Sequence, residues 1–315
     1  MRPRSRSDFA IAIICALPLE ADAIEALFDE TYDRLGKLYD KQPGDANAYI
    51  NGKIGAHNVV LCYMSGMGKG SAASVASSLR VSYPGIRLAL VVGICGGAPY
   101  PTSDQQIFLG DVIISDTVIE YDFGSQHPGD SGFQRKTGVK KTLGGSDREI
   151  LTLLTSLKAT NSRRDFQTQM LEYLHQLQQS ATSRWQHPDL DDVLFEASDE
   201  NKVIRRRDRT KAVSVSLHIG TVASADTVMR SAEHRDKVVS SEKVIGFEME
   251  GAGVWNNISC IIIKGVCDYA DSHKNKEWQA YAAATGASAA KAFLEYWKPT
   301  LREGSEENHC YDLIY

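Results

Sequence analysis

Short, continuous apolar segments recur along this 315-residue chain, and stretches with helical patterns separate them. A strand that is apolar on both of its sides is buried on both sides, as in parallel sheets covered by helices. Alternation of apolar and polar residues would instead indicate a sheet with one face in water. We therefore predict an α/β fold in three layers, with helices on both faces of a mostly parallel or mixed central sheet. The apolar segments lie at 9–15, 57–63, 88–92, 111–119, 213–219 and 258–266.

Composition and charge exclude several classes of function. The net charge of −5 provides no basic field for nucleic acid, and no apolar run reaches the ~20 residues of a membrane span. The histidines form no HExxH or paired motif, so we expect no metal and no cofactor. The six cysteines include no CxxC pair. They are interpreted as reduced core residues of a cytoplasmic protein.

A single domain is expected over residues 8–298, because a chain of this length can bury one large core. A basic, disordered leader is expected at 1–7, and a polar tail or linker at 299–315. Residues 125–212 are polar and form a predicted insertion with partial disorder. The arginine-rich run at 205–209 is interpreted as a solvated loop. Two helical patterns lie inside the insertion, near 147–159 and 165–179.

Polar residues follow the ends of the predicted strands. In an open α/β sheet the ligand site lies beyond the carboxyl ends of the strands, so these residues are expected to converge. The most informative are GFEMEG (246–251) and CDYAD (267–271), where carboxylates end two strand-like segments. They suit a site that holds a sugar diol and protonates a leaving base. The full set is Glu20, Ser65, Gly66, 93–97, 121–124, 223–226, 248–250 and Asp268.

Seven segments of the chain, in their order along the sequence, resemble the nucleoside phosphorylase and nucleosidase superfamily, in particular its methylthioadenosine/adenosylhomocysteine nucleosidase branch. Fungal members found as modules of larger immune-receptor-like proteins are the most similar, because they share the ALPLE segment and a long polar insertion. The resemblance covers 9–124 and 213–297. Its motifs are IIxALPLEA (13–21), SGMGKG (65–70), VVGICGG (91–97), LGDVIISD (109–116), ASADT (223–227), GFEMEG (246–251) and GVCDYAD (265–271).

The resemblance implies a role for four of these residues. Glu20 matches the glutamate that activates water in the hydrolases. Glu250 matches the residue that accepts hydrogen bonds from the ribose 2′- and 3′-hydroxyls, and Met249 packs beside the ribose. Asp268 matches the aspartate that binds purine N7 and the exocyclic amine and protonates N7. Cleavage of an N-glycosidic bond needs this division, because an acid must serve the leaving base while a separate carboxylate activates water.

Further substrate contacts are expected around these four residues. Arg135 and Lys136 follow the site-facing turn at 121–124, and we expect them near the 5′ group of the substrate, where they would suit a phosphorylated nucleoside up to ATP. An aspartate facing the base favours adenine. The other expected contacts with ribose and base are Glu248, Phe123, Gly96, Gly66, Cys95 and Thr227.

The choice between hydrolase and phosphorylase depends on the phosphate ligands. By resemblance, phosphorylases hold phosphate with an early arginine segment and with an arginine and a serine around the GSxG turn. Here Val91 and Ile94 stand at the latter positions and Glu20 stands in the early segment. A phosphate dianion needs cations or N–H donors, so hydrolysis is favoured. A purine nucleoside phosphorylase and a non-catalytic nucleotide-sensing module remain the alternatives.

Structural roles are possible for the same residues. Glu250 and Glu20 could be acidic residues at helix N-termini. Asp268 could cap a turn, and Asp226 is interpreted as the cap of the helix that follows it. The resemblance also implies a homo-oligomer, with a dimer favoured.

Overall fold

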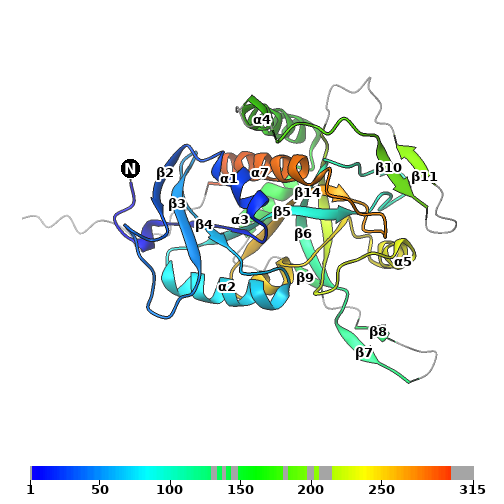
Figure 1. Ribbon diagram of the computed structural model, residues 1–315, viewed down its shortest axis with the longest axis horizontal. Coiled ribbons are helices and arrows are strands. Elements are labelled where there is room, and N and C mark those ends of the chain that lie inside the picture. The colour runs from blue at the N-terminus through cyan, green and yellow to red at the C-terminus, as the bar shows by residue number, and fades with distance from the viewer. Residues whose placement is uncertain are drawn as a thin grey trace, which may run out of the picture.

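A ten-stranded mixed sheet forms the centre of the computed structural model, which describes residues 2–128, 133–136, 140–142, 148–179, 184–196, 202–205 and 215–298. Nine of its strands follow one path (Figure 1). In spatial order they are β13 (Gly246–Glu248), β12 (Leu217–Ser224), β6 (Val112–Glu120), β14 (Cys260–Asp268), β5 (Leu88–Gly97), β1 (Ile11–Cys15), β4 (His57–Tyr63), β3 (Ala48–Ile54) and β2 (Glu30–Arg34). The tenth, β9 (Lys140–Thr142), pairs with β6.

The middle of the sheet is parallel, as the continuous apolar runs predict. Strand β1 lies between β4 and β5 and is parallel to both, and β5 is parallel to β14. Strand β6 runs antiparallel to β14, and the β3–β4 hairpin is antiparallel as well. The prediction of a mixed α/β sheet is therefore confirmed. The short edge strand β2 has a polar sequence and was not predicted.

One end of the sheet closes on itself. Strand β13 pairs with β12 on one side and antiparallel with β5 on the other, where Gly246 lies opposite Gly97 and Phe247 opposite Gly96. The strands β5, β14, β6, β12 and β13 thus form a closed ring. Because of this closure, Glu248 ends a strand that pairs with β5, and β5 also pairs with β14 at Asp268.

Helices cover both faces of the sheet. On one face, α1 (Pro18–Glu25) and α7 (Gln279–Tyr296) pack against the strands, and α4 (Thr160–Gln179) packs against α7 (Figure 1). On the other face lie α2 (Lys69–Ser82) and the short α6 (Gly251–Trp255). Pro18 occupies the first turn of α1, where its missing N–H has no helical partner to lose. The remaining helices are α3 (Arg148–Ser156) and α5 (Ala232–Glu242).

Helix α7 is buried around its whole circumference from Tyr281 to Leu294, because β14 and β5 cover one side and α4 and α1 cover others. It approaches β14 closely at two glycines. A Cβ on Gly265 would lie 1.9 Å from the carbonyl oxygen of Ala282, and one on Gly286 would lie 2.8 Å from that of Gly93. This contact brings α7 directly against the two strands that carry Gly93 and Asp268.

The segment expected to be a disordered leader is instead placed against the body. Residues 6–8 form a 3-10 helix, and Ser5 and Asp8 form its capping box. Pro3 is buried and its carbonyl accepts a hydrogen bond from Tyr39. The predicted tail at 299–315 lies outside the described residues.

The described parts of the insertion contain strands as well as the two predicted helices. Besides α3 and α4, they form two antiparallel hairpins, β7 (Gly124–Gln126) with β8 (Phe133–Arg135), and β10 (Asp192–Phe195) with β11 (Lys202–Arg205). Arg205 was expected in a solvated loop, yet its side chain is 6% exposed. Residues 206–209 of that run lie outside the described residues.

Asp226 also differs from its interpretation. The helix after it, α5, begins later than predicted and is capped by Ser231, which accepts from the backbone N–H of His234. Asp226 instead accepts from the backbone N–H of Lys69, at the first turn of α2, with an N–O distance of 2.6 Å. The aspartate therefore ties the loop after β12 to a different helix.

The prediction that the cysteines are unpaired core residues is confirmed for the five that the structure describes. Cys15, Cys62, Cys95, Cys260 and Cys267 are buried and free. Within the described part of the chain, no helix is long and apolar enough to cross a membrane, and no cluster of side chains could hold a metal ion.

The close approach of α7 predicts an asymmetric pair of glycine substitutions. Gly265→Ala forces a Cβ into the Ala282 carbonyl and should destabilise the protein by about 1–3 kcal/mol. Gly70→Ala places its Cβ in open space in α2 and should be neutral or stabilise by up to about 1 kcal/mol. Urea unfolding monitored by circular dichroism measures both. Equal stability of the two variants would contradict this packing.

Candidate active site

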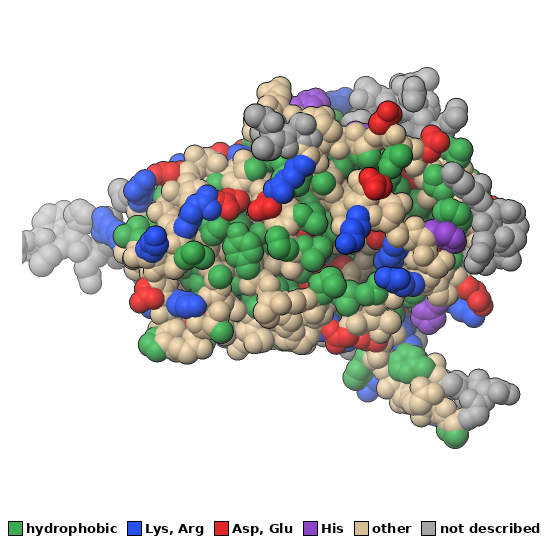
Figure 2. Space-filling view, in the orientation of Figure 1, with side chains coloured by type: hydrophobic (Ala, Val, Ile, Leu, Met, Phe, Trp, Pro, Cys, Tyr) green, Lys and Arg blue, Asp and Glu red, His purple; other side chains and the backbone are tan. Residues whose placement is uncertain are grey.

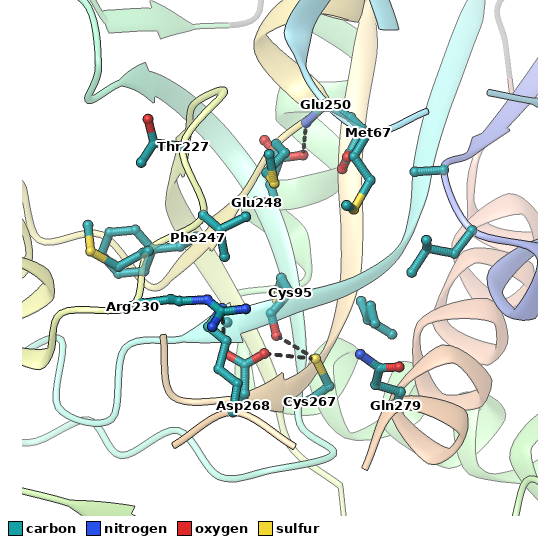
Figure 3. Close-up of a pocket in the computed structure, with 18 of the residues that line it drawn as sticks. Met67, Cys95, Thr227, Arg230, Phe247, Glu248, Glu250, Cys267, Asp268 and Gln279 are labelled. Atoms are coloured by element: carbon teal, nitrogen blue, oxygen red, sulfur yellow. Dashed lines mark hydrogen bonds and ion pairs between the residues drawn. The ribbon is translucent and has the colours of Figure 1, made fainter. Parts of the chain in front are cut away.

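A cavity of about 380 Å³ opens at the ends of β1, β5, β13 and β14. Figure 3 shows Glu248 and Glu250 at one end of this cavity, and Asp268 with Cys267 at the other. Its size is within the range of small-molecule sites. Most of the predicted residues line it: Glu20, Cys95, Gly96, Thr227, Glu248, Met249, Glu250 and Asp268. Segments that are distant in sequence therefore converge as expected for a site at the carboxyl ends of strands.

Four predicted residues do not line the cavity. Gly66 does not reach the cavity, and its neighbour Met67 lines the cavity instead. Phe123, Arg135 and Lys136 belong to or adjoin the β7–β8 hairpin, which projects from the body of the molecule (Figures 1 and 2). Arg135 forms an ion pair with Glu242 of α5, and the Lys136 ammonium lies 5.7 Å from the centre of the Phe123 ring. Proximity along the chain to the 121–124 turn did not bring these residues to the site.

A buried lysine, Lys264, joins two of the predicted carboxylates. Its Nζ donates to Glu250 Oε2 at 3.1 Å and lies 3.9 Å from Glu20 Oε1. Glu20 also accepts from the backbone N–H groups of Ala16 and Leu17 at the start of α1, and from that of Ile94. Glu20 therefore has the helix-terminal role considered above, and in addition it faces the cavity.

Burial dominates the electrostatics of this cluster. It raises the pKa of Glu20, while Lys264 acts in the opposite direction. Burial also disfavours the charged form of Lys264, but the nearby Glu250, Glu20 and Glu248 outweigh it and raise the lysine pKa above its ordinary value. Lys264 is therefore an ammonium held among carboxylates. A carboxylate with a raised pKa beside a substrate-sized cavity is a candidate proton acceptor.

Gly93 allows Glu20 to reach this position. A Cβ at residue 93 would lie 1.9 Å from Glu20 Oε1. Gly93, the first glycine of the GICGG segment, therefore lets the Glu20 carboxylate approach the backbone of β5.

Glu248 and Glu250 have different functions despite their symmetric sequence. The Glu248 side chain accepts from the backbone N–H groups of Glu250 and Gly251, at distances of 2.9–3.1 Å, so it holds the first turn of α6. Burial and the charge of Glu250 raise the pKa of Glu248. Glu250 makes no side-chain capping bond to α6. The helix-terminal role considered for Glu250 thus belongs to Glu248, and the Glu250 carboxylate faces Lys264 and the cavity.

Asp268 is held at the other end of the cavity by three neighbours. Its Oδ1 accepts from the backbone N–H of Ala270 at 2.8 Å and lies 3.1 Å from Lys274 Nζ. Its Oδ2 accepts from the Cys267 thiol at 3.3 Å (Figure 3). Burial raises the pKa of Cys267, so the thiol stays protonated and can donate. Gly96 leaves room for the carboxylate, since a Cβ there would lie 2.9 Å from Oδ1.

Several lining residues were not predicted. Three cations line the cavity, namely Arg230, Lys274 and Lys276. Lys264, which contacts the carboxylates but does not itself line the cavity, was not predicted either, although a single lysine within the apolar run of 260–266 was a signal that could have found it. Arg230 and Lys276 are exposed, and Arg230 points into the cavity in Figure 3. Basic side chains also gather beside α5 on the face shown in Figure 2.

An apolar wall completes the cavity. Tyr121 and Phe247 pack edge to face, with ring centroids 5.7 Å apart, and both line it. The Tyr121 hydroxyl donates to the carbonyl of Thr227. Val228 and Met229 extend the wall on the same loop. These residues give the cavity an apolar wall, whereas Phe123, which had been expected as a substrate contact, does not line it.

The positions that distinguish phosphorylases can now be located. Val91 is buried in β5, and Ile94 lines the cavity while its backbone N–H is used by Glu20. The nearby ammonium of Lys264 faces Glu250 and Glu20. A phosphate dianion at this end would therefore meet carboxylates.

Comparison with known proteins decides the family. The model of the phosphorylase superfamily matches residues 10–298 of the chain. The chain belongs to this superfamily. Among solved structures, a Helicobacter pylori MTAN mutant with 5′-methylthioadenosine in its active site has a TM-score of 0.59 at 18% identity, covering 92% of this chain and 99% of that one. Futalosine hydrolase of the same organism has a TM-score of 0.58 at 18% identity, covering 93% and 100%. These likenesses show the fold.

Two longer proteins are similar in sequence to this superfamily member. A nucleotide-binding leucine-rich repeat (NLR)-like protein of Hyaloscypha variabilis is 35% identical over 303 residues, 91% of this chain but 29% of that protein. A death domain-containing ATP nucleosidase of Amphimedon queenslandica is 24% identical over 75% of this chain and 39% of that protein. The chain thus spans about a third of the length of these relatives.

The buried lysine predicts a pH-dependent loss of stability in Lys264→Met. Removing the ammonium leaves buried carboxylates uncompensated, which should cost about 3–5 kcal/mol near pH 8. The pKa values of Glu20 and Glu248, already raised by burial, rise further in the variant. When the pKa of a carboxylate is higher in the folded than in the unfolded protein, the protein loses stability as the pH rises above the unfolded pKa. The deficit should therefore shrink as the pH falls toward 5.

Urea unfolding of the variant and the wild type across this pH range measures the effect. Lys237→Met is the matched control, because it removes a lysine from an exposed pair with Glu233 and should change stability by less than about 1 kcal/mol. A deficit that does not depend on pH would contradict the electrostatic role of Lys264.

Proposed function

We propose that this chain is a purine N-ribohydrolase that releases adenine from adenine nucleosides or nucleotides. The observation that carries the proposal is the placement of Asp268 at one end of a single cavity and of Glu250 and Glu20 at the other, joined through Lys264. This arrangement separates an acid for the base from carboxylates for the sugar and water. Cleavage of an N-glycosidic bond needs that separation.

Asp268 acts on the base. It donates a proton to purine N7 as the bond to the sugar breaks, which neutralises the leaving adenine, and its other oxygen accepts from the exocyclic amine. Lys274 and Cys267 hold the carboxyl group in place before substrate binds. The apolar wall of Tyr121 and Phe247 packs near the base.

Glu250 and Glu20 act on the sugar and on water. Glu250 accepts hydrogen bonds from the 2′- and 3′-hydroxyls, and Met249 packs beside the ribose. Glu20 takes a proton from the attacking water, for which burial has raised its pKa. Lys264 holds the two carboxylates in a fixed position relative to each other. The products are adenine and ribose, or the corresponding ribose 5-phosphates.

Water is the nucleophile in this proposal because the sugar end of the cavity is unsuited to phosphate. Ile94 and Val91 provide no cation there, and Lys264 is engaged by Glu250. Relatives named as nucleosidases support the same choice. Ribose 1-phosphate as the product, formed only when phosphate is present, would establish the alternative of a purine nucleoside phosphorylase.

The substrate extends to ATP in this proposal. Arg230, Lys274 and Lys276 line the cavity, and the exposed pair could bind a phosphate chain at its mouth. These cations replace Arg135 and Lys136 in that role. The name of the Amphimedon queenslandica relative, an ATP nucleosidase, supports nucleotides as substrates.

The protein is further proposed to be cytoplasmic and a homo-oligomer, with a dimer favoured. The five buried free thiols support a reducing compartment. Light scattering of the purified protein would measure its mass.

The first activity test uses Asp268→Asn and Glu20→Gln. Each variant removes a proton-transfer group without changing its size, so adenine release should fall by roughly 10²–10⁴-fold. Release of free adenine from adenosine, AMP, ATP and methylthioadenosine is measured by chromatography, with and without phosphate. Glu233→Gln is the control, since this carboxylate lies on the surface of α5.

Full activity in Asp268→Asn would contradict the proposed mechanism. If the intact protein releases no adenine from any of the four compounds but still binds one of them, the alternative of a nucleotide-sensing module holds instead.

The second activity test separates the phosphate group from the nucleoside. Arg230→Ala should lower kcat/KM for ATP by about 10–100-fold, because a charge-assisted hydrogen bond contributes about 1.5–3 kcal/mol, and should change adenosine much less. Arg135→Ala serves as the control arginine, because its partner is Glu242 and it lies outside the cavity. Equal losses for ATP and adenosine in Arg230→Ala would contradict the phosphate role.

A further inference from the structure

Asp268 stands where the sheet ladder becomes irregular. Strand β14 pairs regularly with β5 up to Val266, but the register then shifts, and Asp268 rather than Cys267 lies opposite Gly96. Two residues later, Ala270 adopts a left-handed conformation with φ of 54°. A proton donor needs a fixed position to act on a base. At this bulge the strand pairing alone does not fix the position of Asp268, so the other contacts around it are important.

The next residue, Tyr269, is held by the insertion. Its side chain is buried, and its hydroxyl donates to Asp192 Oδ1 at 2.6 Å and accepts from Arg205 Nη1 at 2.6 Å. Asp192 is the first residue of β10 and Arg205 the last residue of β11, and the two lie directly opposite each other in the hairpin. One end of this hairpin therefore holds the tyrosine hydroxyl with both a carboxylate and a guanidinium.

Arg205 is itself firmly fixed. Its guanidinium lies 4.3 Å from the centre of the Phe108 ring and 4.8 Å from that of Tyr100. It also donates to the carbonyl of Ile107, and the other oxygen of Asp192 accepts from the backbone N–H of Leu109. The hairpin end is thus anchored to the segment 99–109, which follows β5.

Helix α5 holds the same tyrosine from its backbone side. Arg235, 2% exposed, donates from Nη1 to the carbonyl of Tyr269 at 2.7 Å. The hydroxyl and the carbonyl of Tyr269 are therefore bound by different elements. Asp268, one residue earlier, accepts from Ala270, one residue later. Holding Tyr269 in place therefore also holds the backbone of residues 268 and 270 on either side of it.

We propose that the β10–β11 hairpin is a positioning element for the catalytic acid, in which Asp192 and Arg205 act through Tyr269 to fix Asp268 against the base. The inference rests on the proposed hydrolase function. Burying the Arg205 guanidinium and partly burying the Asp192 carboxylate against one hydroxyl carries a desolvation penalty that an apolar contact would avoid, so packing alone does not account for the arrangement. The β10–β11 hairpin, in this view, supports the active site from outside the cavity.

Tyr269→Phe tests the proposal, because it removes the hydroxyl and keeps the ring. We expect kcat for adenine release from adenosine and ATP to fall about 10-fold or more, with KM within about twofold, because the ribose contact through Glu250 is unchanged. The limb of the kcat–pH profile that reports the catalytic acid should also shift. Asp192→Asn and Arg205→Lys should give the same pattern, each less than additively with Tyr269→Phe.

Tyr173→Phe is the matched control. Tyr173 is also buried, its hydroxyl also donates to a carboxylate, that of Glu295, and a cation, Lys291, also lies over its ring. It joins α4 to α7, away from the cavity. Both phenylalanine variants should lose a similar, small amount of stability in urea unfolding, but only Tyr269→Phe should change kcat and the pH profile.

The outcomes separate the two proposals. If Asp268→Asn is inactive while Tyr269→Phe keeps the wild-type kcat and pH profile, the positioning role is overturned and the hydrolase function stands. If Asp268→Asn keeps full activity, the role of Asp268 as the acid fails, and the positioning role fails with it. If the intact protein releases no adenine from any of the four compounds, the proposed function itself fails. Should Tyr269→Phe not fold, Asp192→Asn and Arg205→Lys are judged by the same criteria.

Discussion

The contact of Lys264 with Glu250 and Glu20 is the interaction on which one end of the cavity depends, the end that we propose holds the sugar. An ammonium is costly to bury, and so are the carboxylates around it, so each is stable in the interior because of the others. The three side chains come from β14, from the turn before α6 and from the first turn of α1. Their mutual attraction therefore also fixes how these three elements meet, and Glu248 completes the arrangement by holding the start of α6.

The closed ring of strands explains how such distant residues meet. In an open sheet, β13 would be an edge strand, far from β5. Here it pairs with β5 at Gly96 and Gly97, next to the point where Asp268 leaves β14. The glycines at this junction have a clear reason, since a side chain at Gly96 would approach Asp268 Oδ1 to 2.9 Å. The same closure leaves room for a cavity between the carboxylates of β13–α6 and the acid of β14.

Sequence alone predicted the features that depend on local pattern. The apolar runs predicted the buried strands, and the motifs around Glu20, Glu250 and Asp268 predicted residues that do line one cavity. Lys264 was not predicted, because a lysine in an apolar strand contradicts the pattern around it. Arg135 was placed at the site because it lies close to it in sequence, whereas a hairpin carries it away to Glu242. Arg205 was taken as solvated because its burial depends on Phe108, Tyr100 and Tyr269, which no local pattern connects.

The composition of the Lys264 cluster has a consequence for selectivity between bound states. Three carboxylates, Glu20, Glu248 and Glu250, share one ammonium. Even if one carboxylate is protonated, the cluster keeps a net negative charge. A neutral ribose gains little from that charge. A ribosyl ring that has begun to part from its base carries positive charge, and it would be attracted to the same side chains in a medium that screens weakly. If the proposed reaction is right, the cluster is thus suited to the cationic sugar that exists only during bond cleavage, rather than to the neutral sugar that first enters the cavity.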